Sequence, residues 1–578
     1  MRSKHLIQFA IGLAIILILN LVAGQFFFRL DLTEEKRYTI SSATKKVLKN
    51  LPDEVSINVY LEGELPPDYK RLQTAIRETL NEFKIYAGNK LKYRFVNPFD
   101  FSDRKKGKAF LDSLEVKGVR PTSIEANKKD ARTVKAVYPG ALIFYKKYEM
   151  GTILLKNIYE HRNRNAIAEQ QMIKQSIENV EFNLISAIQN IIGSRKKRIG
   201  FLEGHGELNP LRIADLQSAL KLKNYQIFRV NLPYSEIIDS TLDAVVLAKP
   251  DSAFSRVDKY KLDQYIMNGG KALFFVDAVG VHMDSVMRGT GSFTFPYNHN
   301  LTDLLFRYGV RLNSDLVMDL QSSSIPMNIG NMGNRPNFQP VRWTYQPFIN
   351  QFGKHLTTKN IGMVELKMAS TIDTVKANGI KKTPLLLTSK YSKTRKTPAL
   401  IVYNEAQKKP DPSQYTQKHL PVAYMLEGSF KSMFAGQPVP TKYPYREKHK
   451  KLKKDQSIPT QVFVCSDGDF VRNGARIEPK RKRVVPTQLG IGYIGKNKVF
   501  FENRDFVVNV IEYMVNESNL IEAKNREITL RPLDKLRIEQ DGTKWQWFNM
   551  LVPPLLIILF GLVWFQVRKR TFARTKKH

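Results

Sequence analysis

Two long hydrophobic stretches without a charged residue lie near the ends of the chain, over residues 6–28 and 545–567. A helix rises about 1.5 Å per residue, so each stretch is long enough to cross a hydrocarbon core of about 30 Å. Basic residues lie just outside both stretches, in residues 1–5 and 568–578, and the positive-inside rule predicts that both tails are cytoplasmic. The pattern therefore predicts a two-pass inner-membrane protein with most of the chain in the periplasm. A cleaved signal peptide is the alternative for the first stretch, but its apolar core is usually only about 7–15 residues long.

Between these stretches, alternating and helical patterns of hydrophobic residues follow one another. Alternation over residues 55–61 and 92–96 predicts two strands, and helical spacing over residues 72–83 predicts a helix between them. Apolar runs at 141–145 and 151–155 predict further strands of the same unit. A stripe of aliphatic residues with helical spacing then predicts one long helix that ends near residue 192.

Short apolar strands alternate with helical patterns in the middle of the chain, and this is the signature of a parallel, doubly wound sheet. The predicted strands lie at residues 199–202, 225–230, 244–248 and 272–276, and a fifth follows much later at 462–465. The fold class is therefore α/β. Between the membrane spans we predict an N-terminal α/β domain over 29–165 and a connecting helix over 166–193. The first part of an amidotransferase-like α/β domain follows over 194–290. A loop-rich, basic insertion then covers 291–460, and the chain returns to the α/β domain over 461–540.

Acidic residues and one histidine follow the predicted strands, where sheets of this kind place their ligand crevices. They are Glu203, His205 and Glu207 after the first strand and Asp277 after the fourth. In an extended segment Glu203, His205 and Glu207 would share one face, and flanking carboxylates can tune an imidazole for acid–base work. The alternative is a tight turn at Gly204 and Gly206 whose side chains bind backbone amides. We take these four residues as a candidate crevice for a ligand or partner.

Three patterns associated with catalysis or cofactors are incomplete. Cys465 is the only cysteine and lies inside a predicted strand, so the strand–turn–helix elbow that carries an amidotransferase nucleophile is missing. The glycine-rich residues 490–497 partly fit two nucleotide-binding motifs, but no buried strand precedes them and no helix opens at them. Asp467, Asp469 and Asn473 lack the calcium-loop spacing and are better explained by Asx turns. We therefore predict no catalytic residue, no cofactor and no metal, and hence a protein that is not an enzyme.

The chain has 91 Lys and Arg against 54 Asp and Glu, which gives a formal net charge of +37. Most of this charge lies between the two predicted spans, in the part predicted to be periplasmic. That compartment excludes nucleic acid as a partner. A basic surface that faces an anionic bilayer or envelope polymer is the remaining interpretation.

The chain resembles the GldG family, the gliding-motility-associated auxiliary proteins of ABC transporters in Bacteroidetes. The matching segments, in order, are residues 29–41, 59–63, 201–208, 265–271, 426–430, 466–470 and 530–534. His355 followed by Leu356 departs from the His-Pro expected there. The resemblance implies a non-catalytic auxiliary subunit that works with a GldF-type permease and a GldA-type ATPase in surface gliding. It also implies a middle sheet like the amidotransferase-like domain of intraflagellar transport proteins, where that domain serves assembly.

Two other functions remain open at this stage. One is a membrane-tethered, amidotransferase-like hydrolase that uses His205 with Glu203 or Glu207. The other is a scaffold that binds envelope polymers through its basic surface. Members of the family are often labelled substrate-binding, but no residue pattern in this chain independently supports a small-molecule site.

Overall fold

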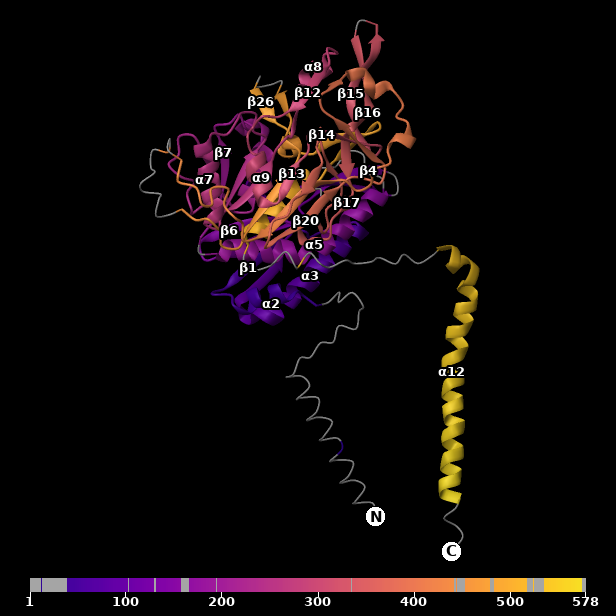
Figure 1. Cartoon of the computed structure of the whole chain (residues 1–578). Coiled ribbons are helices and arrows are strands. Elements are labelled where there is room, and N and C mark those ends of the chain that lie inside the picture. The colour runs from indigo at the N-terminus through magenta and orange to yellow at the C-terminus, as the bar shows by residue number, and fades with distance from the viewer. Residues whose placement is uncertain are drawn as a thin grey trace. The chain divides into compact units, whose positions relative to one another are not determined.

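A computed structural model of the chain is shown in Figure 1. It describes Gly12, Tyr443, Ala523 and residues 39–101, 103–128, 131–156, 166–193, 195–333, 335–440, 453–478, 483–516 and 535–573. The chain divides into a larger unit, Met1–Arg526, and a smaller unit, Glu527–His578. The predicted N-terminal span over residues 6–28 lies outside the described residues except for Gly12.

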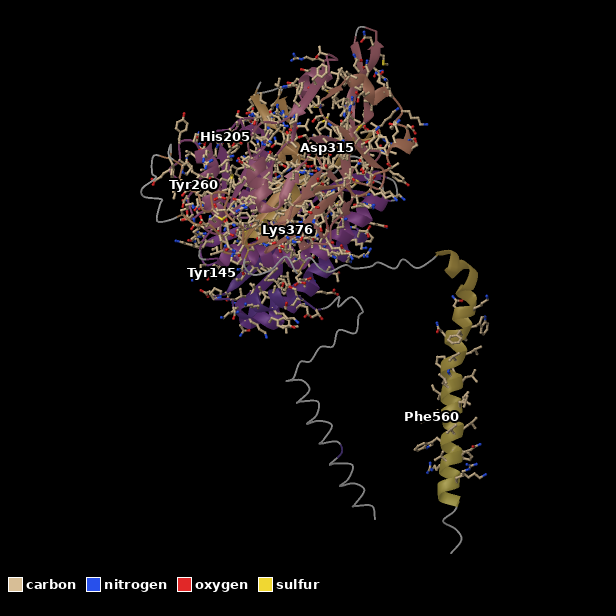
Figure 2. The ribbon with its side chains drawn as sticks, in the orientation of Figure 1. Tyr145, His205, Tyr260, Asp315, Lys376 and Phe560 are labelled. Carbon is tan, nitrogen blue, oxygen red and sulfur yellow. The ribbon has the colours of Figure 1, made fainter. Side chains whose placement is uncertain are left out.

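The described part of the smaller unit is the helix α12 (Lys535–Ala573). Within it, Gln546–Arg570 is long and apolar enough to cross a membrane, with a mean hydropathy of 2.2, and none of this segment is buried in the protein. Its apolar side chains, such as Phe560 in Figure 2, project away from the helix. The predicted C-terminal stretch over 545–567 thus forms a candidate membrane helix, and it is the one such helix in the described part of the chain.

The N-terminal part of the larger unit is a four-stranded sheet with the order β2-β1-β5-β6. β1 runs parallel to β2, with the helix α3 as the crossover between them, and antiparallel to β5. The side chains of α2, α3 and α5 form one hydrophobic core with β1 and β5. Every strand and helix predicted before residue 193 is present. Their bounds are α2 (Ser42–Lys49), β1 (Val55–Val59), α3 (Pro67–Ala87), β2 (Leu91–Phe95), α4 (Arg104–Val116), β3 (Thr122–Lys128), β4 (Ala131–Val137), β5 (Gly140–Tyr145), β6 (Tyr148–Ile153) and α5 (Ala166–Ile192).

The central sheet has eight strands in the order β17-β20-β23-β24-β10-β9-β7-β8. The five strands from β24 to β8 are parallel, and they are the five that the sequence predicts. Their bounds are β7 (Arg198–Glu203), β8 (Gln226–Asn231), β9 (Ala244–Ala248), β10 (Lys271–Phe275) and β24 (Thr460–Cys465). Cys465 is fully buried in β24 and packs in the core, as expected from its position in the sequence.

Helices cover both faces of this sheet. α6 (Ala214–Leu222) and α11 (Asn503–Val515) pack on one face, and α7 (Arg256–Met267) and α9 (Thr302–Tyr308) pack on the other. Alternate residues of each central strand face the two cores, which explains why these strands are apolar throughout. The larger unit is therefore a mixed helix and strand fold with a doubly wound, parallel centre.

The remaining three strands come from the region expected to be a loop-rich insertion over 291–460. They are β17 (Gln351–Phe352), β20 (Ile380–Leu387) and β23 (Pro421–Gly428), and each is antiparallel to its neighbour. β20 begins with Ile380-Lys381-Lys382-Thr383-Pro384, and this lysine-rich, proline-containing start hides its strand character.

The rest of the 291–460 region is rich in strands and has its own hydrophobic core around Trp343. Its long hairpin of β15 and β16 projects from the larger unit in Figure 1. The glycine-rich residues 490–497, expected to be a loop, form part of a two-stranded hairpin of β27 and β28. The bounds are β11 (Val279–Gly280), α8 (Met283–Met287), β12 (Ser292–Pro296), β13 (Val310–Leu312), β14 (Asp315–Asp319), β15 (Ser322–Met332), β16 (Arg335–Ile349), β18 (Val364–Glu365), β19 (Ile372–Thr374), β21 (Ser392–Lys396), β22 (Ala399–Ile401), β25 (Ala475–Glu478), β26 (Arg483–Pro486), β27 (Ile491–Ile494) and β28 (Asn497–Phe500).

Candidate functional site

The predicted site residues lie at the carboxyl edge of the parallel strands. The strand order reverses between β7 and β9, and such a reversal places the loops that follow the two strands beside a crevice. Here the loops after β7 and β9 are joined by backbone hydrogen bonds. Leu208 N donates to Ala248 O at 3.0 Å, and Asp251 N donates to His205 O at 2.9 Å.

Two glycines turn the chain sharply after β7. Gly204 has φ 116° and Gly206 has φ 74°, a backbone region that side chains with a Cβ rarely adopt. The segment is therefore not extended, and the expected common face of Glu203, His205 and Glu207 does not form. Glu203 instead forms an ion pair with Arg229 on the neighbouring strand β8.

His205 and Glu207 do meet, in a buried position. The His205 side chain is 4 % exposed, its Nδ1 lies 3.7 Å from Glu207 Oε1, and its Nε2 lies 3.3 Å from Asp258 Oδ2. The ring stacks on Phe254 with 3.7 Å between centroids. The backbone N–H of His205 also donates to Glu207 Oε2 at 2.7 Å, so Glu207 closes a tight turn on its own loop.

Asp258 connects His205 to the start of α7. Ser255 is the N-cap of this helix, and its hydroxyl both accepts from the Asp258 backbone and donates to Asp258 Oδ2 at 2.7 Å. Lys261, one turn along the helix, donates to Asp258 Oδ1 at 3.1 Å and to Leu232 O at 2.7 Å. His205, Asp258 and Lys261 thus form a buried chain of alternating charges that ties the loop after β7 to α7.

The pKa values of this chain follow from its geometry. Burial alone would lower the pKa of His205, but its contact with Asp258 and the negative charges of Glu207 and Asp258 beside the ring raise it to about 9. Burial would raise the pKa of Asp258, but hydrogen bonds from His205, Ser255 and Lys261 lower it to about 2. At neutral pH His205 is therefore a cation held between carboxylates, and a protonated imidazole cannot act as a general base.

Asp277 belongs to a second cluster at the ends of β9, β10 and β24. Lys249 Nζ lies 2.9 Å from Asp277 Oδ2 and 2.6 Å from Asp469 Oδ2. Gly468 N donates to Asp277 Oδ1 at 2.6 Å. Burial raises the pKa of Asp277 although Lys249 opposes this shift. Asp467 Oδ1 accepts from Asp469 N at 2.8 Å, which is the Asx turn that the sequence predicts.

The structure therefore divides the four predicted site residues among three places. Glu203, at the end of β7, pairs with Arg229 of β8. His205 and Glu207, in the loop after β7, lie against Asp258 of α7, and Asp277 lies beside Lys249. No sequence pattern points to Lys249 or Lys261 as partners of these residues. Asp258 could have been found, because Ser255 and Asp258 fit the capping pattern Ser-x-x-Asp before a helix. Among the described residues, no group of three or more His, Cys, Asp and Glu side chains is arranged to hold a metal ion.

Comparison with known proteins identifies the two main parts of the larger unit. The model of a family described as "ABC-type uncharacterized transport system" matches residues 196–510, from β7 into α11, and so includes the whole central sheet. A second family, described as a domain of unknown function, matches residues 34–144 in the N-terminal part.

Two individual proteins are also similar to this chain. An uncharacterized protein of Borreliella burgdorferi is 20% identical over 585 residues, which cover 98% of this chain and 99% of that protein. The solved structure of the mmIFT52 N-terminal domain aligns with a TM-score of 0.30 and 13% identity, over 55% of this chain and 98% of that one.

Proposed function

This chain belongs to the ABC-type uncharacterized transport system family, and on that premise we propose that it is a non-catalytic, membrane-anchored auxiliary subunit of an ABC transport complex. The family assignment implies association with ABC transporter components. The observation that carries the proposal is the family match over the whole central sheet in a chain that also has the exposed apolar helix Gln546–Arg570. Such a helix is suited to pack beside the membrane helices of a permease.

The charge pairing at the sheet edge supports a mechanical role over a catalytic one. His205 and Lys249 pair with the largely buried carboxylates of Asp258 and Asp469, which are far from them in sequence. Lys261 pairs with Asp258 in its own helix and also donates to Leu232 O, which ties that helix to the segment after β8. Paired charges of this kind hold the loops in one arrangement. We propose that the larger unit acts as a stiff body that carries conformational changes of a permease to a partner in the periplasm.

The finer assignment rests on the family resemblance. We propose a GldF-type permease and a GldA-type ATPase as the partners, a role in gliding motility, and a two-pass topology with the larger unit in the periplasm. ATP would be hydrolysed by the ATPase subunit. The resemblance of residues 29–41 and 466–470 to that family supports these proposals.

Purification of the tagged full chain from native membranes in a mild detergent tests the proposal. We expect an ABC permease and an ABC ATPase to co-purify. In a matched variant, residues 546–570 are replaced by an unrelated apolar helix of equal length, and this variant should stay in the membrane but lose both partners. Absence of any ABC subunit from the wild-type preparation, also after chemical cross-linking in the membrane, would refute the proposal.

A further inference from the structure

A second charged region lies in the strand-rich part of the larger unit, far from His205. It surrounds a cavity of about 710 Å³ between β16, β21 and the segment with the short helices η4 (Tyr403–Gln407) and η5 (Pro412–Gln414). β21 pairs with β14, which begins at Asp315, and Figure 2 shows Asp315 well apart from His205. We call this space the β16–β21 cavity.

Cations outnumber carboxylates around the β16–β21 cavity. The cationic lining residues are Arg342, Lys393, Arg395, Lys408 and Lys409, and the acidic ones are Glu405 and Asp411. Both acids are already engaged. Glu405 accepts two hydrogen bonds from Arg395 Nη1, at 3.0 and 3.1 Å, and Asp411 Oδ1 accepts from the backbone and hydroxyl of Ser413 at 3.0 and 2.8 Å.

Only Arg395 of the five cations is paired with a carboxylate among the described residues, and Lys393 Nζ donates to the amide oxygen of Gln414 at 2.9 Å. Within the described part of the chain, no carboxylate lies within ion-pair distance of Arg342, Lys408 or Lys409. All three side chains are exposed to solvent. A group of like charges around a concave surface raises the local concentration of anions.

One aromatic side chain of the lining, Trp343, belongs to the hydrophobic core beneath the cavity. It is 1 % exposed, and Tyr345 and Tyr403 pack against its ring, with centroids 6.1 and 6.3 Å away. Its indole nitrogen is buried, so Trp343 does not supply a ligand contact in this arrangement. Its place beside the cavity makes its fluorescence a reporter of binding there.

We propose that the β16–β21 cavity binds a small organic anion, with a phosphate or carboxylate group at Arg342, Lys408 and Lys409. The rest of the ligand would meet polar side chains of the lining, which include the Gln414 side chain that accepts from Lys393 Nζ. The volume lies within the range of about 300–1,000 Å³ that is usual for small-ligand sites. Such a ligand can be free or can be the end of an envelope polymer, and the chemistry of recognition is the same in both.

The test titrates the purified full chain in detergent with glucose 6-phosphate and with a short oligogalacturonate, and follows tryptophan fluorescence. Three of the four tryptophans, Trp545, Trp547 and Trp564, belong to the smaller unit, so a change that disappears in Trp343→Phe reports on the cavity. We expect saturable binding with a dissociation constant below about 1 mM for one or both anions and no saturable signal with glucose. Tighter binding of the oligomer indicates a polymer ligand, and tighter binding of the monosaccharide indicates a free one.

Charge variants, measured by calorimetric titration, show whether binding occurs at this cavity. The combined variant Arg342→Gln, Lys408→Gln and Lys409→Gln should raise the dissociation constant at least tenfold. The matched variant Lys376→Gln, Lys390→Gln and Lys418→Gln removes the same charge from exposed positions outside the cavity lining. It should change the dissociation constant less than twofold. Failure of both anions to bind, equal binding of glucose, or equal loss of affinity in the two variants would overturn the inference. Because the purified chain is tested without a permease, this result is independent of the proposed partners.

Discussion

Two regions of the larger unit are built from the same kinds of charged side chain but use them differently. At the carboxyl edge of the central sheet, His205, Lys249 and Lys261 each lie within 3.3 Å of a carboxylate oxygen. At the β16–β21 cavity, Arg342 and Lys408 have no such partner in the described part of the chain. Charges that are paired inside the fold stabilise it, whereas charges left unpaired around a hollow remain available to a ligand.

The difference also bears on where a ligand would bind. Doubly wound sheets usually bind ligands at the carboxyl ends of their strands. In this chain the charged side chains at that edge are paired with one another, whereas the proposed ligand site lies in the strand-rich region between β14 and β23. The fold therefore indicates where a ligand site can be formed. Whether the charged side chains there are paired within the protein indicates whether they are available to a ligand.

The largest loss of stability is expected from Asp258→Ala, which removes the shared carboxylate from the buried chain of charges at His205. The substitution leaves His205 and Lys261 buried without their shared carboxylate, and removal of one member of a buried pair typically costs about 3–5 kcal/mol. We expect the hydrogen-exchange protection of α7 to fall by this amount, since α7 carries both Asp258 and Lys261.

An exposed pair of the same type is the control. Asp373 pairs with Arg311 at 2.7 Å, and both side chains are more than half exposed. Asp373→Ala should lower the free energy of unfolding by less than about 1 kcal/mol, because water already screens this pair. If the two substitutions cost the same, the buried chain of charges at His205 is not what stabilises this edge.

A smaller change in stability is expected from His205, and it should depend on pH. The pKa of His205 is raised from 6.5 to about 9, so its contribution to stability is fully present below about pH 6.5 and is lost as the pH rises through about 9. We expect His205→Gln to destabilise the chain by about 1–2 kcal/mol at about pH 6 and much less at about pH 10, after allowance for solvent screening. Urea unfolding of wild type and variant in detergent at both pH values measures the difference. A cost that is the same at both pH values would mean that His205 is not held as a cation.

Much of the central fold could be predicted because its signals are local. The five parallel strands are short, apolar runs between helical patterns, and the turn at Asp467 follows from an Asx residue at a strand end. The bend at Gly204 and Gly206 was also visible as an alternative, but the separation of Glu203 from His205 depends on Arg229, which comes from another strand.

The contacts that decide the role of each site are non-local, and the sequence does not show them. His205 and Asp258 are 53 residues apart, and Lys249 and Asp469 are 220 apart. The β16–β21 cavity could not be predicted from the sequence either. Its cations come from separate segments, since Arg342 belongs to β16 and Lys408 to a segment after β22. For residues 291–460 long loops and a strand-rich insertion are expected, but the sequence does not show where the individual strands lie or that they pack around Trp343 as a core.

The smallest effect on stability is expected from substitutions at the β16–β21 cavity. Arg342, Lys408 and Lys409 are exposed and have no carboxylate partner among the described residues, so the fold gains little from them. Mutual repulsion of neighbouring like charges is mildly unfavourable. The combined glutamine variant should therefore unfold thermally within about 0.5 kcal/mol of wild type, or slightly above it, whereas Lys261→Gln should be clearly destabilised because Asp258 loses a buried partner. A large loss of stability in the cavity variant would show that these cations serve the fold, and the distinction between paired and available charge would fail at the site where it matters for binding.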